Sequence, residues 1–435
     1  MFLNIILEKF QNLFKPIYNK SFVLQNIDYL IGLVIILIIF LSTFIQSDYI
    51  GYLALSVITL TFIKLLVKPQ EKLSMTAGDK FLILYFIFVL ISLFGSTLFS
   101  LSLKGFYKTL TYLGFYVSFV HYLKDNRKMV KYILIAIAFS AFGEALVAIK
   151  QNFCSVSEIS GWQDVSRLNP EEVMTRVYGT LKPYNPNLFG GYMLSVMPAT
   201  LIAVFLPFKN NNYSITAIGF IVFITTTVAL VLTGCRGAYI GLFFELFFLC
   251  IFTYKMLKPF YKKIFMIIFS IISTVLFFII ITIPSLKARI LSIFAFRGDS
   301  SNSFRFNVYN SCIRMFKDNW LLGIGCGNRN FREIYGLYMK TGFDALSAYN
   351  IYLEMAVESG IFALLSFLAF LYCYISKAVK YIIKNCNIKS IYSTIAIISI
   401  AGVLVHGFVD TVFFRPQIQF IFWIMVGILR VILYK

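Results

Sequence analysis

The amino-acid sequence contains twelve apolar stretches, each about long enough to cross a membrane as a helix. A spanning helix needs about 20 mostly apolar residues. Lipid offers backbone groups no hydrogen-bond partner, so such stretches fold as helices. The pattern predicts an all-α polytopic membrane protein with about 12 transmembrane helices. The stretches cover approximately residues 29–45, 49–67, 81–99, 106–123, 132–149, 186–208, 213–235, 237–254, 264–283, 360–375, 391–409 and 416–434.

The composition supports this class of protein. Hydrophobic residues make up 59% of the 435 residues and charged residues only 13%, which is about half the charged fraction of an ordinary soluble domain. We expect a single membrane domain. Its parts are an N-terminal interfacial segment (1–28), transmembrane helices 1–5 (29–149), an outer loop (150–185), helices 6–9 (186–283), a large outer loop (284–346) and helices 10–12 (347–435).

The basic residues predict how these helices are oriented. Short cytoplasmic loops are enriched in Lys and Arg, and 22 of the 39 basic residues fall on one side if both termini are cytoplasmic. Both long loops then lie outside. A net charge of +20 would also suit nucleic acid. Because the apolar stretches place most of the chain in lipid, we expect a bilayer and no nucleic-acid partner.

The two basic residue types are distributed differently on this topology. Ten of the twelve arginines lie on the outer side, whereas 20 of the 22 inner basic residues are lysines. The planar guanidinium group can hold a phosphate or carboxylate with two hydrogen bonds, which the ammonium group of lysine cannot. The distribution therefore suggests an anionic ligand outside. Alternatively, the outer arginines cap helix ends and pair with Asp and Glu.

The first candidate site is the segment 232–241, Leu-Thr-Gly-Cys-Arg-Gly-Ala-Tyr-Ile-Gly. It places Arg236 at the outer N-terminus of the eighth predicted span, where unsatisfied backbone N–H groups and the helix dipole favour an anion. An arginine there adds to an anion site that the helix already provides. The alternative is that Arg236 extends to a lipid phosphate.

The second candidate site is the segment 303–317 in the large outer loop. Ser303 is expected to cap a helix in which Arg305 and Tyr309 share one face. Another stripe of this helix carries the apolar residues Phe304, Val308, Cys312 and Met315, which recur at helical spacing and are expected to pack against the protein. The glycine-rich segment 323–327 follows no strand, so we interpret it as a tight turn and not as a nucleotide-binding loop.

A third segment leads into the tenth span. Asn350, Glu354 and Glu358 recur every four residues, so they are expected on one face of a helix that enters the bilayer from outside. Carboxylates near a helix N-terminus are also favoured by the helix dipole alone, and both interpretations remain open.

A fourth segment follows the eleventh span. His406 and Asp410 are one turn apart at its outer end, with Arg415 just beyond. A carboxylate at this spacing can orient an imidazole or keep it protonated. An ordinary capped helix end would show the same pattern.

Together these segments resemble the O-antigen ligase and polymerase (Wzy-C, WaaL-like) superfamily of bacterial envelope enzymes. The resemblance runs from Arg176 to the C-terminus, with a ligase-like region at about 176–375. Ala-Leu-Ser-Ala-Tyr at 345–349 and the segment 406–416 look more like the IctB-like branch, named for bicarbonate transport. The other motifs that carry the resemblance are Arg-Val-Tyr-Gly-Thr at 176–180, Asn-Pro-Asn-Leu at 185–188, Gly-Cys-Arg-Gly-Ala at 234–238, the Arg305 helix with Leu-Gly-Ile-Gly at 322–325, and Asn350 before Gly360.

The resemblance implies a GT-C-like glycosyltransferase in the bacterial inner membrane. Such an enzyme takes a glycan from an undecaprenyl diphosphate carrier at the periplasmic face and passes it to a glycan or lipid acceptor, as in lipopolysaccharide biosynthesis, without metal or cofactor. The carrier diphosphate would be held by Arg236 and Arg305. Supporting roles would fall to Arg176, Asn350, Asp410 and Arg415.

The chain departs from the ligase pattern at the residue before Asn350. Ligases have a histidine there as the proposed acid/base group, and this chain has Tyr349. A tyrosine with a pKa near 10 is a poor base at neutral pH. The role of the base would then pass from Tyr349 to His406 or Glu354, or this branch performs a different reaction.

Two other functions remain open from the sequence. An IctB-like bicarbonate transporter would need a polar route through the bilayer midplane, usually with broken helices, and Gly190-Gly191 in the sixth span could mark such a break. A scaffold that binds a lipid diphosphate without catalysis would keep Arg236 and Arg305 and need no base.

Overall fold

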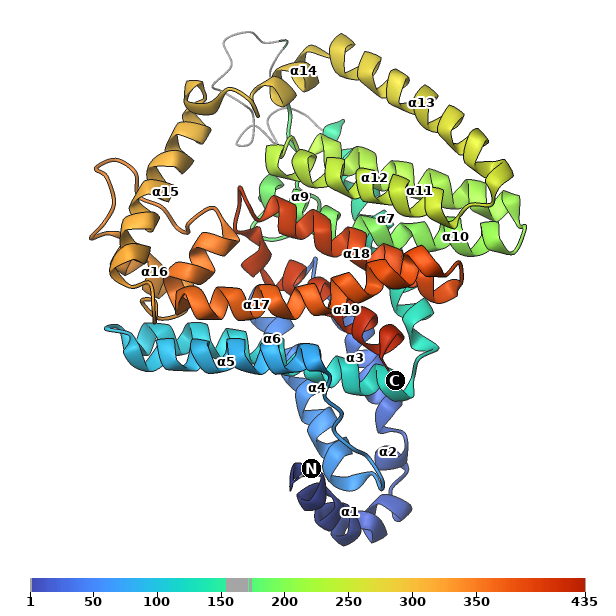
Figure 1. Cartoon of the computed structure of the whole chain (residues 1–435), viewed down its shortest axis with the longest axis vertical. Coiled ribbons are helices and arrows are strands. Elements are labelled where there is room, and N and C mark those ends of the chain that lie inside the picture. The colour runs from blue at the N-terminus through green and yellow to red at the C-terminus, as the bar shows by residue number, and fades with distance from the viewer. Residues whose placement is uncertain (1, 154–170, 172–173, 435) are drawn as a thin grey trace.

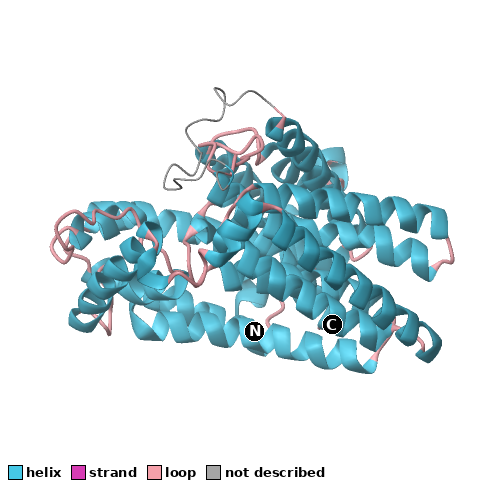
Figure 2. Ribbon diagram, turned by 90° about the horizontal axis from the view of Figure 1, so that it is seen from above, coloured by secondary structure: helices cyan, strands magenta, loops and turns pink. Residues whose placement is uncertain are grey.

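The structure is a computed structural model that describes residues 2–153, 171 and 174–434. Most of the first long outer loop, residues 154–170, therefore lies outside the described residues. The described part of the chain consists of helices and their connections and contains no β-strand (Figure 2). This confirms the prediction of an all-α polytopic fold.

The helices follow one another along the chain as shown in Figure 1. The N-terminal part contains α1 (Phe2–Lys20), α2 (Phe22–Gln25), α3 (Ile27–Leu41), α4 (Ser47–Val67), α5 (Ala77–Gly95), α6 (Phe99–Asp125) and α7 (Met129–Asn152). The central part contains α9 (Pro186–Val196), η3 (Met197–Leu201), α10 (Ile202–Lys209), α11 (Tyr213–Leu232), α12 (Arg236–Met256) and α13 (Pro259–Thr282). The large loop holds α14 (Pro284–Leu291), η4 (Phe296–Gly298), α15 (Ser300–Asp318) and α16 (Asn328–Tyr335), and the C-terminal part holds α17 (Ile351–Lys384), α18 (Ile388–His406), η5 (Val412–Phe414) and α19 (Pro416–Leu433).

All twelve predicted stretches are helical, and ten of them form helices with the length and composition of a full membrane span. The other two are α3, which has 15 residues, and α6, which has 27 residues and carries several charged side chains. The sixth span does not break at Gly190-Gly191, which lie inside α9. It changes from α-helix to 3-10 helix at Met197–Leu201, where Pro198 cannot donate a backbone hydrogen bond.

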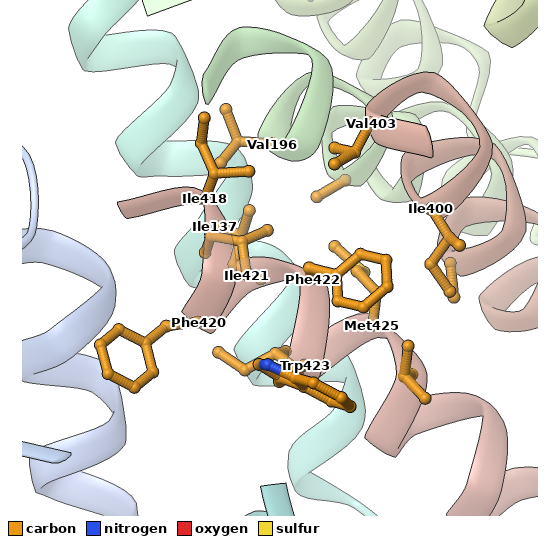
Figure 3. Packing of buried hydrophobic residues seen from close by; sticks show 14 of the residues in the cluster. Ile137, Val196, Ile400, Val403, Ile418, Phe420, Ile421, Phe422, Trp423 and Met425 are labelled. Atoms are coloured by element: carbon orange, nitrogen blue, oxygen red, sulfur yellow. The ribbon is translucent and has the colours of Figure 1, made fainter. Parts of the chain in front are cut away.

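The spans differ in how far protein surrounds them. The C-terminal helix α19 lies among the other helices, and 83% of its apolar window is buried. Phe422 and Trp423 project from it into the main hydrophobic cluster (Figure 3), where the Trp423 ring lies against the rings of Tyr116 in α6 and Phe370 in α17. By contrast, the most apolar span, α13, has no buried residue. A helix that is apolar on all sides and unburied is suited to contact with lipid.

A break at Gly360 divides α17 into two helices. Gly360 has a φ of 79°, a conformation that suits glycine, and the break leaves nearby backbone groups without their helical partners. The preceding outer loop supplies new ones. Ile361 N–H donates to the Trp320 carbonyl (2.9 Å), and the Glu358 carbonyl accepts from Gly325 N–H (2.9 Å). The break thus attaches the outer loop to α17, and Figure 1 shows α15 and α16 at one end of the paired α5 and α17.

Replacing Gly360 with alanine should destabilise the protein. The added Cβ would collide with the Leu321 carbonyl, and a positive φ is strained for alanine, at a cost of about 1–3 kcal/mol. We expect a lower midpoint of thermal unfolding in detergent. Gly51→Ala in α4 is the matched control, because the added Cβ has no heavy atom within 4 Å and alanine favours a helix. Equal midpoints for the two variants would contradict the strained break.

Candidate functional site

Four arginines converge on one small cavity of about 60 Å³. They come from four places in the sequence: the segment before α9, the first residue of α12, the helix α14 and the first turns of α15. Among the described residues the lining contains no carboxylate. It consists of Arg176, Asn187, Cys235, Arg236, Gly237, Arg289, Ser301 and Arg305.

Arg236 begins α12, as the sequence predicts. Its side chain is 8% exposed, and its Nη1 atom lies 2.8 Å from Asp299 Oδ1. Asp299 also accepts the backbone N–H of Asn302 (3.0 Å) and so caps α15. Burial alone would raise the pKa of Asp299, but the hydrogen bonds from Arg236 and Asn302 lower it overall. Asp299 therefore stays ionised and fixes the Arg236 guanidinium at the cavity.

The start of α15 differs from the prediction. The sequence predicts Ser303 as the cap, but the helix begins at Ser300 and its cap is Asp299. A carboxylate that both caps the helix and pairs with Arg236 determines this earlier start. Three of the four predicted apolar positions are buried, because Val308, Cys312 and Met315 are each 0% exposed, whereas Phe304 is only partly buried and packs against them.

The turn between α11 and α12 positions two more arginines through its backbone carbonyls. Arg176 Nε donates to the Thr233 carbonyl (2.8 Å), and Arg289 Nε donates to the Gly234 carbonyl (2.7 Å). Gly234 has a φ of +60°, so the chain turns sharply there and the two carbonyls point towards these side chains. The sequence does not identify Arg289 as a site residue, because its position depends on how α14 folds back onto this turn.

Arg305 and Tyr349 form the side of the site nearest α17. Arg305 Nη2 lies 3.5 Å from Asp410 Oδ2, and its guanidinium carbon lies 5.7 Å from the centre of the Tyr349 ring. Tyr309, on the same face of α15 as predicted, donates its hydroxyl to the Tyr349 carbonyl (3.1 Å). Tyr349 has a φ of 51°, and this strained backbone is held in place by its neighbours.

The pKa of Tyr349 is raised above its usual value. Burial is the largest cause, followed by the negative charge of Asp410, with a smaller contribution from Glu354, and these outweigh the opposing effect of Arg305. The phenol therefore stays protonated at neutral pH. It can donate a hydrogen bond but is not suited to take up a proton.

His406 is only 1% exposed and lies beside the cavity. Its Nε2 atom is 3.7 Å from Cys235 Sγ. The imidazole ring also packs against Gly237 and Gly191, where a Cβ atom would leave it too little room. The sequence suggests that Asp410 orients His406, whereas the structure directs the Asp410 carboxylate to Arg305. Burial would raise the pKa of Cys235, but the neighbouring His406 lowers it overall. From the sequence alone this cysteine has only the character of a small hydrophobic residue.

The start of α17 carries the remaining predicted residues. Asn350 caps the helix by accepting the N–H groups of Tyr352 (3.0 Å) and Leu353 (2.9 Å), and it donates to the Phe408 carbonyl (3.0 Å). Glu354 accepts the N–H of Ala348 (2.9 Å). Both Glu354 and Glu358 line a second, larger cavity, so these two carboxylates share a face as predicted.

Arg415 is exposed at the N-cap of α19. It is absent from the described lining of the arginine cavity, so the structure does not bring this predicted supporting residue together with Arg236 and Arg305.

One cluster elsewhere has the composition of a metal site. Glu71, His121 and Asp125 place three possible ligand atoms within 4.8 Å of one another. However, Lys64 Nζ already lies 2.7 Å from Asp125 and 3.3 Å from Glu71. In Glu71 burial would raise the pKa, but the contacts with His121 and Lys64 lower it well below its usual range. The lysine ammonium occupies the place of a cation, so we interpret the cluster as an ion-pair network.

The fold is that of a multi-pass helical membrane protein, and the arginine cavity lies between its spans and its large loop (284–346). Residues 221–368 match the O-antigen ligase family model, Wzy_C. The match confirms the resemblance to the O-antigen ligase and polymerase superfamily, and its range contains Arg236, Arg289, Arg305, Tyr349 and Glu354. No curated protein matches the chain.

If the arginine cavity binds a diphosphate, inorganic pyrophosphate should stabilise the protein. A ligand that binds only the folded state at 100 times its Kd contributes about 2.7 kcal/mol, which raises the midpoint of thermal unfolding. We expect Arg289→Ala and Arg236→Ala to abolish this shift. Arg332→Ala is the control, because Arg332 lies in the same loop but is half exposed and pairs with Asp344 (3.1 Å). A full shift in Arg289→Ala would show that the anion binds elsewhere.

Proposed function

We propose that this protein transfers or polymerises a glycan from an undecaprenyl diphosphate carrier at the periplasmic face of the bacterial inner membrane. The observation that carries the proposal is the cavity lined by four arginines, three of which lie within the segment that matches the O-antigen ligase family. A lipid-linked diphosphate is the anionic ligand on which the members of this superfamily act. The outer position of the arginines follows from the expected orientation with both termini in the cytoplasm.

The arginines would stabilise the leaving group. During transfer, the acceptor oxygen forms a bond to the anomeric carbon, and the bond from that carbon to the carrier diphosphate breaks. The electron pair leaves with the diphosphate, so negative charge develops on the phosphate oxygens. Guanidinium groups that are already fixed by Asp299, Thr233 and Gly234 can meet this charge without reorganisation. The dipole of α12, which begins at Arg236, acts in the same direction.

The proton of the acceptor hydroxyl needs a base, and we assign this role to Glu354. Tyr349 stays protonated, and His406 is enclosed by Cys235 and two glycines. Glu354 instead opens into the larger cavity and is close enough to Tyr349 to affect its pKa. Tyr349 in turn covers Arg305. The carboxylate therefore lines a different cavity from Arg305 but is near Tyr349, and we assign the acceptor to the cavity that Glu354 lines.

Surface glycans of a deletion strain test this function. Loss of the protein should leave lipid-linked glycan untransferred or shorten the surface glycan. Arg236→Ala and Arg305→Ala should fail to restore transfer, because removal of one fixed donor to a developing negative charge costs about 10²–10³-fold in rate. Arg332→Ala should restore it. Unchanged glycans in the deletion strain, together with impaired bicarbonate uptake, would overturn the transferase assignment in favour of transport.

The assignment of the base is tested with purified protein. Glu354→Gln should lose transfer and keep the pyrophosphate-induced thermal shift, because the amide preserves the shape of the side chain but cannot take up a proton. If Glu354→Gln retains transfer and His406→Gln loses it, the base is His406. If both variants bind pyrophosphate and both transfer normally, neither residue is the base.

Tyr349 is expected to act through its ring. Tyr349→Phe keeps the aromatic face over Arg305 and should retain most of the transfer activity. Tyr349→Ala should reduce it, because a cation–π contact at a partly exposed site contributes about 0.5–1 kcal/mol. Transfer rates of the two variants across pH 6–9 provide the measurement. A loss in Tyr349→Phe as large as in Glu354→Gln would show that the hydroxyl itself takes part.

A further inference from the structure

A second cavity in the described part of the chain is separate from the arginine cluster. It has a volume of about 460 Å³, within the range of about 300–1,000 Å³ that is usual for ligand sites. It lies between α5, α6, the outer half of α17 and α19. The loop segment 326–329 closes one side. This loop is held tightly against α6, because a Cβ at Gly105 would collide with the Cys326 carbonyl.

The interior of this cavity is aromatic and acidic. Tyr112 and Trp423 supply flat rings, and the indole N–H of Trp423 donates to Gln419 Oε1 (2.7 Å). Glu354 and Glu358 line the same space. Aromatic faces suit the C–H surface of a sugar ring, and carboxylate and amide oxygens accept hydrogen bonds from its hydroxyl groups. An acyl chain could not donate hydrogen bonds to the remaining acceptor positions of these buried oxygens, at a cost in free energy.

The mouth of the cavity has the opposite character. Lys104, Lys108 and Arg329 line it and are exposed, with Asp48 as the acidic residue among them. Lys104 precedes Tyr112 by eight residues of α6, so at 1.5 Å per residue the basic side chain lies about 12 Å along the helix from the aromatic ring. The cavity therefore changes from basic at its outer end to acidic and aromatic inside.

We propose that this cavity is the acceptor site and that it binds the end of a glycan chain that carries a phosphate or carboxylate group. The proposal rests on the transferase function above and identifies its second substrate. The sugar ring occupies the aromatic interior with one hydroxyl directed at Glu354, and the anionic group is held by Lys104 and Arg329 at the mouth. The donor diphosphate stays in the arginine cavity on the other side of Tyr349.

The two substrates then meet across a short stretch of chain. Glu354 accepts the N–H of Ala348, and the next residue, Tyr349, faces Arg305. Thr411, beside Asp410, is 2.6 Å from the Ser347 hydroxyl. These contacts connect Glu354, which lines the larger cavity, to Arg305 at the arginine cavity through the segments 347–350 and 410–411.

Binding to the purified full-length protein tests the proposal. The probe is the surface oligosaccharide released from the producing cells, used in its native form and after its phosphates are removed and its carboxyls reduced. Tryptophan fluorescence and calorimetry report binding. The variants are Lys104→Glu with Arg329→Glu, which reverses the charge at exposed positions, and Thr109→Trp, which fills the interior. Arg332→Glu is the matched control.

We expect the native probe to bind at least tenfold more tightly than the neutralised probe. Both sets of variants should lose at least tenfold in acceptor affinity while keeping the pyrophosphate shift, which also shows that they are folded. If Thr109→Trp fails to fold, the charge-reversal pair decides alone. Wild-type affinity in that pair would overturn the proposal, as would equal binding of the two probes.

Lipid binding at the basic mouth is tested by competition. If the mouth instead holds an anionic lipid headgroup, phosphatidylglycerol nanodiscs should compete with the probe, and such competition would overturn the assignment to a glycan. Failure of the transferase function itself is distinguishable, because the deletion strain would then keep normal glycans. A deletion strain with altered glycans that the charge-reversal pair fully restores would overturn only the acceptor site.

Discussion

The break in α17 at Gly360 is the constraint on which the outer half of this protein depends. A break in a helix leaves carbonyl and N–H groups without their helical partners. Here the outer loop satisfies them through Trp320, Ile324 and Gly325, and the Ser92 hydroxyl adds a bond of 2.6 Å to the Glu358 carbonyl. The same contacts join α5, α17 and the outer loop into one wall. Residues 326–329 of this wall line the larger cavity, so the cavity would be open on that side without it.

The arginine cavity depends on a balance between the repulsion of its positive charges and the acceptors that hold them in place. Four guanidinium groups line a cavity of about 60 Å³. At such short range their positive charges repel one another, which lowers the stability of the folded protein. Among the described residues, the acceptors that hold these side chains include Asp299, Asp410 and the carbonyls of the sharp turn at 233–234. These hold each guanidinium in place but leave the lining itself without a carboxylate among the described residues. Under the proposed function, a doubly charged phosphate would relieve part of this repulsion.

Much of the fold could be predicted from the sequence, because spans and buried helix faces are local patterns. The position of Arg236 at a helix start, the turn at 323–327 and the buried residues Val308 and Cys312 all follow from short-range spacing. Residues whose role depends on distant partners could not be predicted. Asp299 replaces Ser303 as the cap because it also meets Arg236, which belongs to a helix far earlier in the chain. Similarly, Arg289 and the contact between Cys235 and His406 arise only when α14 and α18 pack against the same turn.

The first turn of α17 and the residues just before it contact groups at both cavities. A movement of this turn would therefore affect both cavities at once. Asn350 caps that turn and is bonded to the Phe408 carbonyl, Tyr349 before it carries a strained φ of 51°, and Glu354 holds the backbone of Ala348. The helix between the cap at Asn350 and the break at Gly360 is short. A displacement of so short a helix moves the Tyr349 ring over Arg305 and the Glu354 carboxylate together. One element therefore positions both Tyr349 and Glu354, which under the proposed function keeps leaving group and base in a fixed relation.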